Sequence, residues 1–163
     1  MKYSRITLGV LLFVALSSCA EISWAQHTIS SKAATDSTEV MKQVDRFLEA
    51  FTKLEWQNFT DCFSADATAF FPPSAKVPLR ANNKAEIESI FQKVFDGARA
   101  RRSSPPYLDI HPLNTRVAVF DATAIVTFHL EDPGMLGRRT IVFRKEKGTW
   151  KIVHLHASGI TTD

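Results

Sequence analysis

Two histidines near the C-terminus, His154 and His156, have a spacing that could bind a metal ion. Residues i and i+2 of a β-strand point to the same face about 7 Å apart, so both imidazoles could reach one ion. A third ligand would come from His129 or His111, which lie on other predicted segments. No carboxylate is placed to orient the rings, as established metal sites have. We therefore expect packed or interface histidines and no metal site.

General acid–base catalysis would need a titratable side chain inside an apolar pocket, where loss of solvation raises the pKa of a carboxyl group. The candidates are Asp66, Asp109 and His156, with Glu131 as a further donor. Asp66 follows a predicted helix and is typical of a turn or cap residue. Asp109 and Glu131 fall on the polar side of predicted strands. The residues alone leave open whether the protein is an enzyme.

Apolar side chains are the third group of candidates, since the chain contains twelve Phe and three Trp. Most of them must form the core, but a few at the mouth of a cavity would bind a flat apolar molecule. The eight residues that we expect to bind such a ligand are Phe51, Trp56, Phe70, Phe128, Leu130, Ile141, Phe143 and Leu155.

The first half of the chain should position these residues on helices. Apolar residues at helical spacing follow Asp36-Ser37-Thr38-Glu39, a capping pattern that predicts a helix start at Asp36. A second short helix is expected over 56–63 and a strand over 67–71, which Pro72 ends. Asn83 with Glu86 opens another predicted helix, and Gly97 is expected at its end.

The second half has period-two patterns that predict four strands, over 107–119, 123–131, 139–146 and 149–159. Short turns between them favour an antiparallel meander, and helices followed by strands indicate an α+β fold. In the strand 123–131 the apolar face should meet the helices; its members are Ala124, Val126, Phe128 and Leu130. In the last strand, alternation alone does not choose between the set containing Trp150, Ile152, His154 and His156 and the set containing Val153, Leu155 and Ala157.

The N-terminus is typical of an exported protein. Lys2 and Arg5 precede the apolar run Ile6 to Leu16, which has the length of a signal peptide. Two processing sites compete: Ser23-Trp24-Ala25 resembles a signal-peptidase site, and Leu16-Ser17-Ser18-Cys19 resembles a lipobox. The protein would be periplasmic or secreted in the first case, and a membrane-anchored lipoprotein through Cys19 in the second.

These features divide the chain into a signal peptide at 1–25, a flexible polar linker at 26–35 and one domain at 36–160. Twenty basic and seventeen acidic residues give a formal net charge of +3 and are well mixed apart from Arg99, Arg101 and Arg102. Nucleic-acid binding needs a longer basic stripe, so no such partner is expected, and no pattern indicates a cofactor. Cys62 should be a buried residue without an intramolecular disulfide.

Three segments resemble the NTF2-like superfamily, in particular its SnoaL-like branch and the related association domain of calcium/calmodulin-dependent kinases. They are the stretch 56–67 (WQNFTDCFSADA), the predicted hairpin 117–126 (VAVFDATAIV) and the closing strand 150–159 (WKIVHLHASG). The resemblance implies a cone-shaped fold, with a curved antiparallel sheet wrapped around N-terminal helices and a pocket between them. It also implies frequent homodimerisation through the outer face of the sheet.

The resemblance further implies which residues face the pocket. The kinase association domains have arginines there, whereas this chain aligns Leu130, Ile141 and Ala157 with those positions. Val153, Leu155 and Ala157 would face inward, which leaves His154 and His156 on the outer face. We expect a pocket for a small apolar or amphipathic molecule. Two alternatives stay open: an isomerase, cyclase or hydrolase acting on a hydrophobic carbonyl compound, and a self-association module.

Overall fold

The N-terminal helix α1 spans Ser18–Lys53. The computed structural model describes residues 18–72, 78–132 and 134–161, so the apolar run of the predicted signal segment lies outside the described residues. Contacts divide the chain after Thr35, and the description below concerns the unit that begins at Asp36. Among the described residues, no helix combines the length and the apolar character that crossing a membrane requires.

The extent of α1 corrects two expectations. The helix does not begin at Asp36, and residues 26–35, expected to form a flexible linker, are helical. No Gly or Pro lies between residues 18 and 53 to interrupt the backbone hydrogen bonds. Asp36 is buried, and its carboxylate accepts a hydrogen bond from Lys145 Nζ at 2.7 Å instead of capping the helix. This hydrogen bond connects α1 to the strand that contains Lys145, which is 109 residues further along the chain.

Three short elements and a second long helix follow. Helix α2 spans Trp56–Thr60, strand β1 Phe63–Phe70, strand β2 Arg80–Ala81 and helix α3 Lys84–Arg101. The predicted cap of α3 is confirmed, because the Asn83 side chain accepts a hydrogen bond from Glu86 N at 2.9 Å. The expected end at Gly97 is wrong, since α3 continues for four more residues and buries Ala98 against the core.

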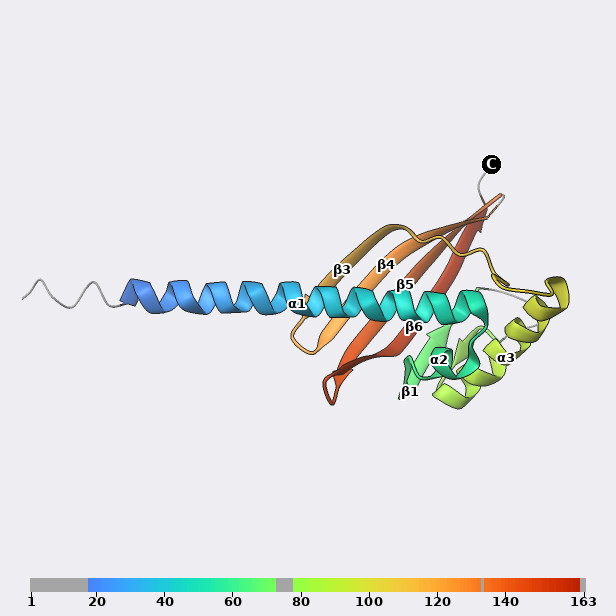
Figure 1. The fold of residues 1–163 in the computed structure, drawn as a ribbon, viewed down its shortest axis with the longest axis horizontal. Helices are drawn as coiled ribbons and strands as arrows, with labels where there is room; N and C mark the ends of the chain where they lie inside the picture. The colour runs from blue at the N-terminus through green and yellow to red at the C-terminus, as the bar shows by residue number, and fades with distance from the viewer. Residues whose placement is uncertain (1–17, 73–77, 133, 162–163) are drawn as a thin grey trace, which may run out of the picture. The chain divides into compact units, whose positions relative to one another are not determined.

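In the described part of the chain, the sheet has six strands in the order β2-β1-β6-β5-β4-β3; Figure 1 labels all of them except β2. Its last four strands are β3 (Leu113–Phe120), β4 (Thr123–Asp132), β5 (Met135–Glu146) and β6 (Thr149–Thr161). These four form the predicted antiparallel meander. Strand β1 corrects the prediction of a wholly antiparallel sheet, because it pairs with β6 in parallel.

A β-bulge in β6 decides which of its side chains face the helices. Phe143 of β5 pairs with Ile152, but the preceding Val142 pairs with His154, so Val153 is the extra residue. Trp150 and Ile152 on one side of the bulge and Leu155 on the other are therefore all buried on the inner face. Strict alternation of side chains between the two faces would place Trp150 and Ile152 opposite Leu155, and it does not hold across the bulge.

The core lies between the inner face of the sheet and the helices. It contains a cluster of aromatic rings centred on Phe59 of α2, which lies 4.7 Å from Phe91 of α3 and 5.3 Å from Phe47 of α1, measured between ring centroids. The core residues of the strands are mainly aliphatic. The helices thus meet the sheet across an aromatic layer that leaves a cavity on one side.

Candidate functional site

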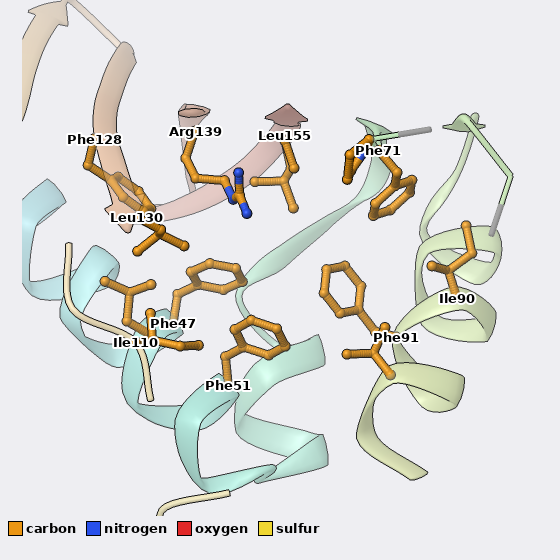
Figure 2. Close-up of a pocket in the computed structure, with 14 residues that line it drawn as sticks. Phe47, Phe51, Phe71, Ile90, Phe91, Ile110, Phe128, Leu130, Arg139 and Leu155 are labelled. Atoms are coloured by element: carbon orange, nitrogen blue, oxygen red, sulfur yellow. The ribbon is translucent and has the colours of Figure 1, made fainter. Parts of the chain in front are cut away.

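A cavity of about 320 Å³ lies between α1, α3 and the inner face of the sheet. Figure 2 shows aromatic rings from α1 and α3 on one side of it and side chains from β4, β5 and β6 on the other. Its volume is at the lower end of the range usual for small-molecule sites. The lining residues are Phe47, Leu48, Phe51, Phe71, Pro72, Ile90, Phe91, Val94, Ile110, Phe128, Leu130, Arg139, Leu155 and Ala157.

Half of the predicted ligand-binding residues line this cavity, namely Phe51, Phe128, Leu130 and Leu155. Ile141 and Phe143 are fully buried on the inner face of β5 and belong to the core beyond the cavity. Trp56 packs against the core, with its ring 5.5 Å from that of Phe95. Phe70 lies on the outer face of the sheet, where its ring contacts His154 and His156.

Arg139 is the charged residue among the described lining residues, and the sequence did not predict it there. It lies on the inner face of β5, directly between Phe128 of β4 and Ala157 of β6. The resemblance aligned Leu130, Ile141 and Ala157 with the arginine positions of the kinase domains, whereas Arg139 lies one step further than Ile141 along the same face of β5. Alternation could have revealed it, since Arg139, Ile141 and Phe143 share one parity.

The three candidate catalytic residues lie elsewhere. Asp66 is exposed on β1 and accepts a hydrogen bond from Arg144 Nη2 at 2.9 Å. That bond, with a second from Ser64, lowers the pKa of its carboxyl group. Asp109 is also exposed and lies 2.7 Å from His111 Nε2, while His156 is on the outer face of the sheet. Within the described part of the chain, none of the three lines the cavity.

A second, more open hollow of about 780 Å³ adjoins the cavity. The two share Phe51, Ile110 and Leu130, so this hollow offers a route from solvent to the apolar cavity. Its lining mixes apolar residues with titratable ones, which are Arg101, Arg102, Tyr107, Asp109, His111 and Glu131. Apart from Arg139, the titratable side chains near the cavity, among the described residues, therefore line the adjoining hollow and not the cavity itself.

The histidines do not converge. His154 and His156 lie on the outer face, where His154 Nδ1 is 2.8 Å from Thr68 Oγ1, and His129 lies two strands away on β4. Among the residues that the structure describes, no group of three or more His, Cys, Asp or Glu side chains is placed to hold a metal ion. Cys62 is buried, and burial raises the pKa of its thiol.

The model of the SnoaL-like domain family matches residues 40–163, which contain the cavity and the whole sheet. The chain belongs to this family. Its fold is the curved NTF2-like α+β fold with an open, mixed sheet. A comparison with curated proteins gives no match.

Solved structures share the fold of this SnoaL-like chain. A Streptomyces avermitilis protein of the NTF2-like family, described as a candidate dehydratase, is 20% identical, with 79% of this chain and 99% of that chain covered and a TM-score of 0.64. The S. rosetta CaMKII hub is 25% identical over 76% of this chain and 96% of that one, with a TM-score of 0.57. A Parabacteroides distasonis protein described as a candidate ketosteroid isomerase is 19% identical over 72% of this chain and 84% of that one, with a TM-score of 0.53.

Proposed function

We propose that this SnoaL-like domain binds a small apolar or amphipathic molecule in the cavity between α1, α3 and the sheet. One observation carries the proposal: every described lining residue except Arg139 is apolar. An apolar ligand would displace water from a surface that cannot hydrogen-bond to it, which is favourable. The flat aromatic walls formed by Phe47, Phe51 and Phe91 favour a ligand with a planar or extended hydrocarbon part.

Binding can be measured by thermal shift and calorimetry on the purified protein with a panel of aromatic and aliphatic compounds. A ligand at a hundred times its Kd should stabilise the fold by about 2.7 kcal/mol. Ala157→Leu should abolish this effect because the added side chain fills the cavity. Ser158→Leu is the matched control, since Ser158 is the next residue of β6 and pairs with Arg138 on the outer face. Binding that Ala157→Leu leaves unchanged would refute the proposal.

Catalysis on a hydrophobic carbonyl compound is the alternative that the described dehydratase and ketosteroid isomerase suggest. It would require an acid or base near the cavity, and Asp109 and Glu131, which line the adjoining hollow, are the carboxylate candidates. The lining favours binding over catalysis, because a guanidinium does not release its proton near neutral pH. We expect a bound panel compound to be recovered unchanged by mass spectrometry, whereas turnover would favour the enzyme.

Self-association is a second candidate function, favoured by the outer face of the sheet. A row of paired residues crosses this face from β3 to β1: Ala118, Ile125, Val142, His154 and Thr68. Ile125 of β4, next to the edge strand β3, is 37% exposed, and Phe120 and Phe70 are exposed beside the row. Exposed apolar side chains gathered on one sheet face are typical of an interface between copies of a chain.

We also propose that the protein is exported. The support is the basic start and the apolar run Ile6 to Leu16. The mass of the protein recovered from its native cells would test this, with processing before Gln26 or before Cys19 as the expected results. A full-length chain still carrying Met1 would contradict export by this signal.

A further inference from the structure

The apolar cavity and the open hollow beside it meet at three side chains. Phe51 of α1, Ile110 of the loop before β3 and Leu130 of β4 line both spaces. Figure 2 shows Ile110 and Leu130 on the opposite side of the cavity from Ile90. A molecule bound in the cavity can therefore extend past these side chains into the hollow.

The two spaces suit different parts of a ligand. The cavity, of about 320 Å³, has apolar walls, and a polar group moved into such surroundings without a hydrogen-bond partner loses several kcal/mol of solvation, roughly 2–7. The hollow, of about 780 Å³, is larger and mixes apolar with titratable side chains. An amphipathic molecule would therefore place its hydrocarbon part in the cavity and its polar part in the hollow.

Arg139 does not alter this division, although it lines the cavity. Its Nη1 atom donates hydrogen bonds to the carbonyl oxygens of Arg138 and Ser158, each at 3.0 Å. The guanidinium is thus already engaged by the protein. We therefore assign the polar part of a ligand to the hollow.

Side chains of both charges line the hollow. Arg101 and Arg102 are positive, Asp109 and Glu131 are negative, and all four are exposed. A head group with a net charge would meet like charges here as well as opposite ones. An uncharged head with several hydroxyl groups can donate hydrogen bonds to the carboxylates and accept them from the guanidinium groups. The half-buried ring of Tyr107 adds a flat surface against which such a head can pack.

We propose that the cavity and the hollow form one binding site for an amphipathic molecule with a bulky, uncharged, hydroxyl-rich head. The hydrocarbon part occupies the cavity, and the head lies in the hollow. This inference rests on the proposed function, because it specifies the chemistry of a ligand in the same cavity. It makes the hollow the part of the site that determines specificity for the head.

Four compounds with the same octyl chain test the proposal: octyl β-D-glucoside, octan-1-ol, octanoate and octylammonium. Calorimetry at pH 7.5, at concentrations too low for the glucoside to form micelles, gives the Kd of each. We expect the glucoside to bind at least about tenfold more tightly than octan-1-ol, because hydrogen bonds to charged groups contribute that much. It should also bind more tightly than either charged compound.

Glu131→Ala tests the place of the head. It should weaken binding of the glucoside by about tenfold and leave the affinity for octan-1-ol within a factor of about three. Glu131 is chosen because the other carboxylate, Asp109, already contacts His111, with 2.7 Å between Oδ1 and Nε2. Glu49→Ala is the matched control, since Glu49 is an exposed carboxylate on α1 that is not among the described residues lining either space. It should change neither affinity.

Ala157→Leu tests the place of the hydrocarbon chain, because Ala157 is among the described lining residues of the cavity and not of the hollow. It should abolish binding of both the glucoside and octan-1-ol. If this variant does not fold, Val94→Phe serves the same purpose by filling the cavity from α3.

A glucoside that binds no more tightly than octan-1-ol would overturn the inference and leave the proposed function intact. The inference would also fail if octanoate or octylammonium bound more tightly than the glucoside, or if Glu131→Ala and Glu49→Ala had equal effects. Glucoside binding that persists in the variant with the filled cavity would place the molecule elsewhere and overturn it too. Binding of none of the four compounds, together with failure of the wider panel, would overturn the proposed function as well.

Discussion

Phe59 is the residue on which the aromatic wall of the cavity depends. It is fully buried and comes from α2, a helix of five residues. Its ring packs against those of Phe47 and Phe91, which both line the cavity. A short helix thus supports two walls of the site at once, although Phe59 itself is not part of the lining.

Phe59→Ala should lower the free energy of unfolding by about 3–5 kcal/mol, the cost usual for removing a fully buried aromatic ring. Urea unfolding followed by tryptophan fluorescence would measure it. Phe120→Ala is the control, because Phe120 is 60% exposed at the turn between β3 and β4, and it should change stability by less than about 1 kcal/mol. Equal losses in the two variants would show that Phe59 does not support the core as argued.

Single residues of the cavity could be predicted where strand alternation is regular. Phe128 and Leu130 were placed on the inner face of β4 in this way, and both line the cavity. Trp150 and Leu155 could not be placed together, because a bulge depends on pairing with β5 and leaves no sign in the local pattern. Arg139 was missed because a charged residue at an inward position runs against the tendency of charged groups to remain in water.

At the scale of elements, α3 shows how tertiary packing overrides a local stop signal. Gly97 lies inside the helix, and the next residue, Ala98, is fully buried. Burial of this last turn outweighs the entropic cost of a glycine in a helix, which is about 1 kcal/mol relative to alanine. The helix therefore extends to Arg101.

Gly97→Ala should stabilise the protein by about 0.5–1 kcal/mol, because a Cβ at this position meets nothing within 4 Å and the helix no longer carries the entropic cost. Gly148→Ala is the opposite case, since Gly148 has a φ of +84° in the turn between β5 and β6, and it should destabilise by about 1–2 kcal/mol. Thermal unfolding of both variants would test the pair. A destabilised Gly97→Ala variant would show that the last turn of α3 is strained.

Apart from the two-residue strand β2, the described elements could be predicted from the sequence, but not how they all pair. The turns between β3, β4, β5 and β6 fix an antiparallel order, because a short connection can only reverse the chain. Strand β1 is separated from β6 in the described chain by α3 and four strands, so no local signal determines that they pair in parallel. The extension of α1 before Asp36 was missed because its polar residues lack the periodicity that packing against a core produces.

For the whole molecule, the proposed association of two copies through the outer face of the sheet leads to a prediction about pH. His154 lies in the row of residues that crosses this face and is partly buried against Thr68 and Phe70. Burial, followed by the nearby positive charges of His156 and Arg80, lowers the pKa of its imidazole. The folded chain therefore favours the neutral ring, and covering the face with a second copy would bury the ring further.

We expect a dimer that dissociates on acidification. The pKa of His154 is already lowered in the folded single chain, and further burial by a second copy would make it lower in the dimer than in the monomer. The neutral ring would then contribute to dimer stability above about pH 6.5, and this contribution would be lost as the pH falls below that value. Light scattering after size exclusion should give a dimer at pH 7.5 and a larger monomer fraction at pH 5. His156→Phe should keep the dimer at pH 7.5 and retain more of it at pH 5, since it removes a positive charge beside His154.

Two further variants serve as controls. His111→Gln removes an exposed histidine on the loop before β3 and should leave the pH dependence unchanged. Ile125→Arg should give a monomer at both pH values. A dimer that is unaffected at pH 5, or a monomer at both pH values, would rule out this interface.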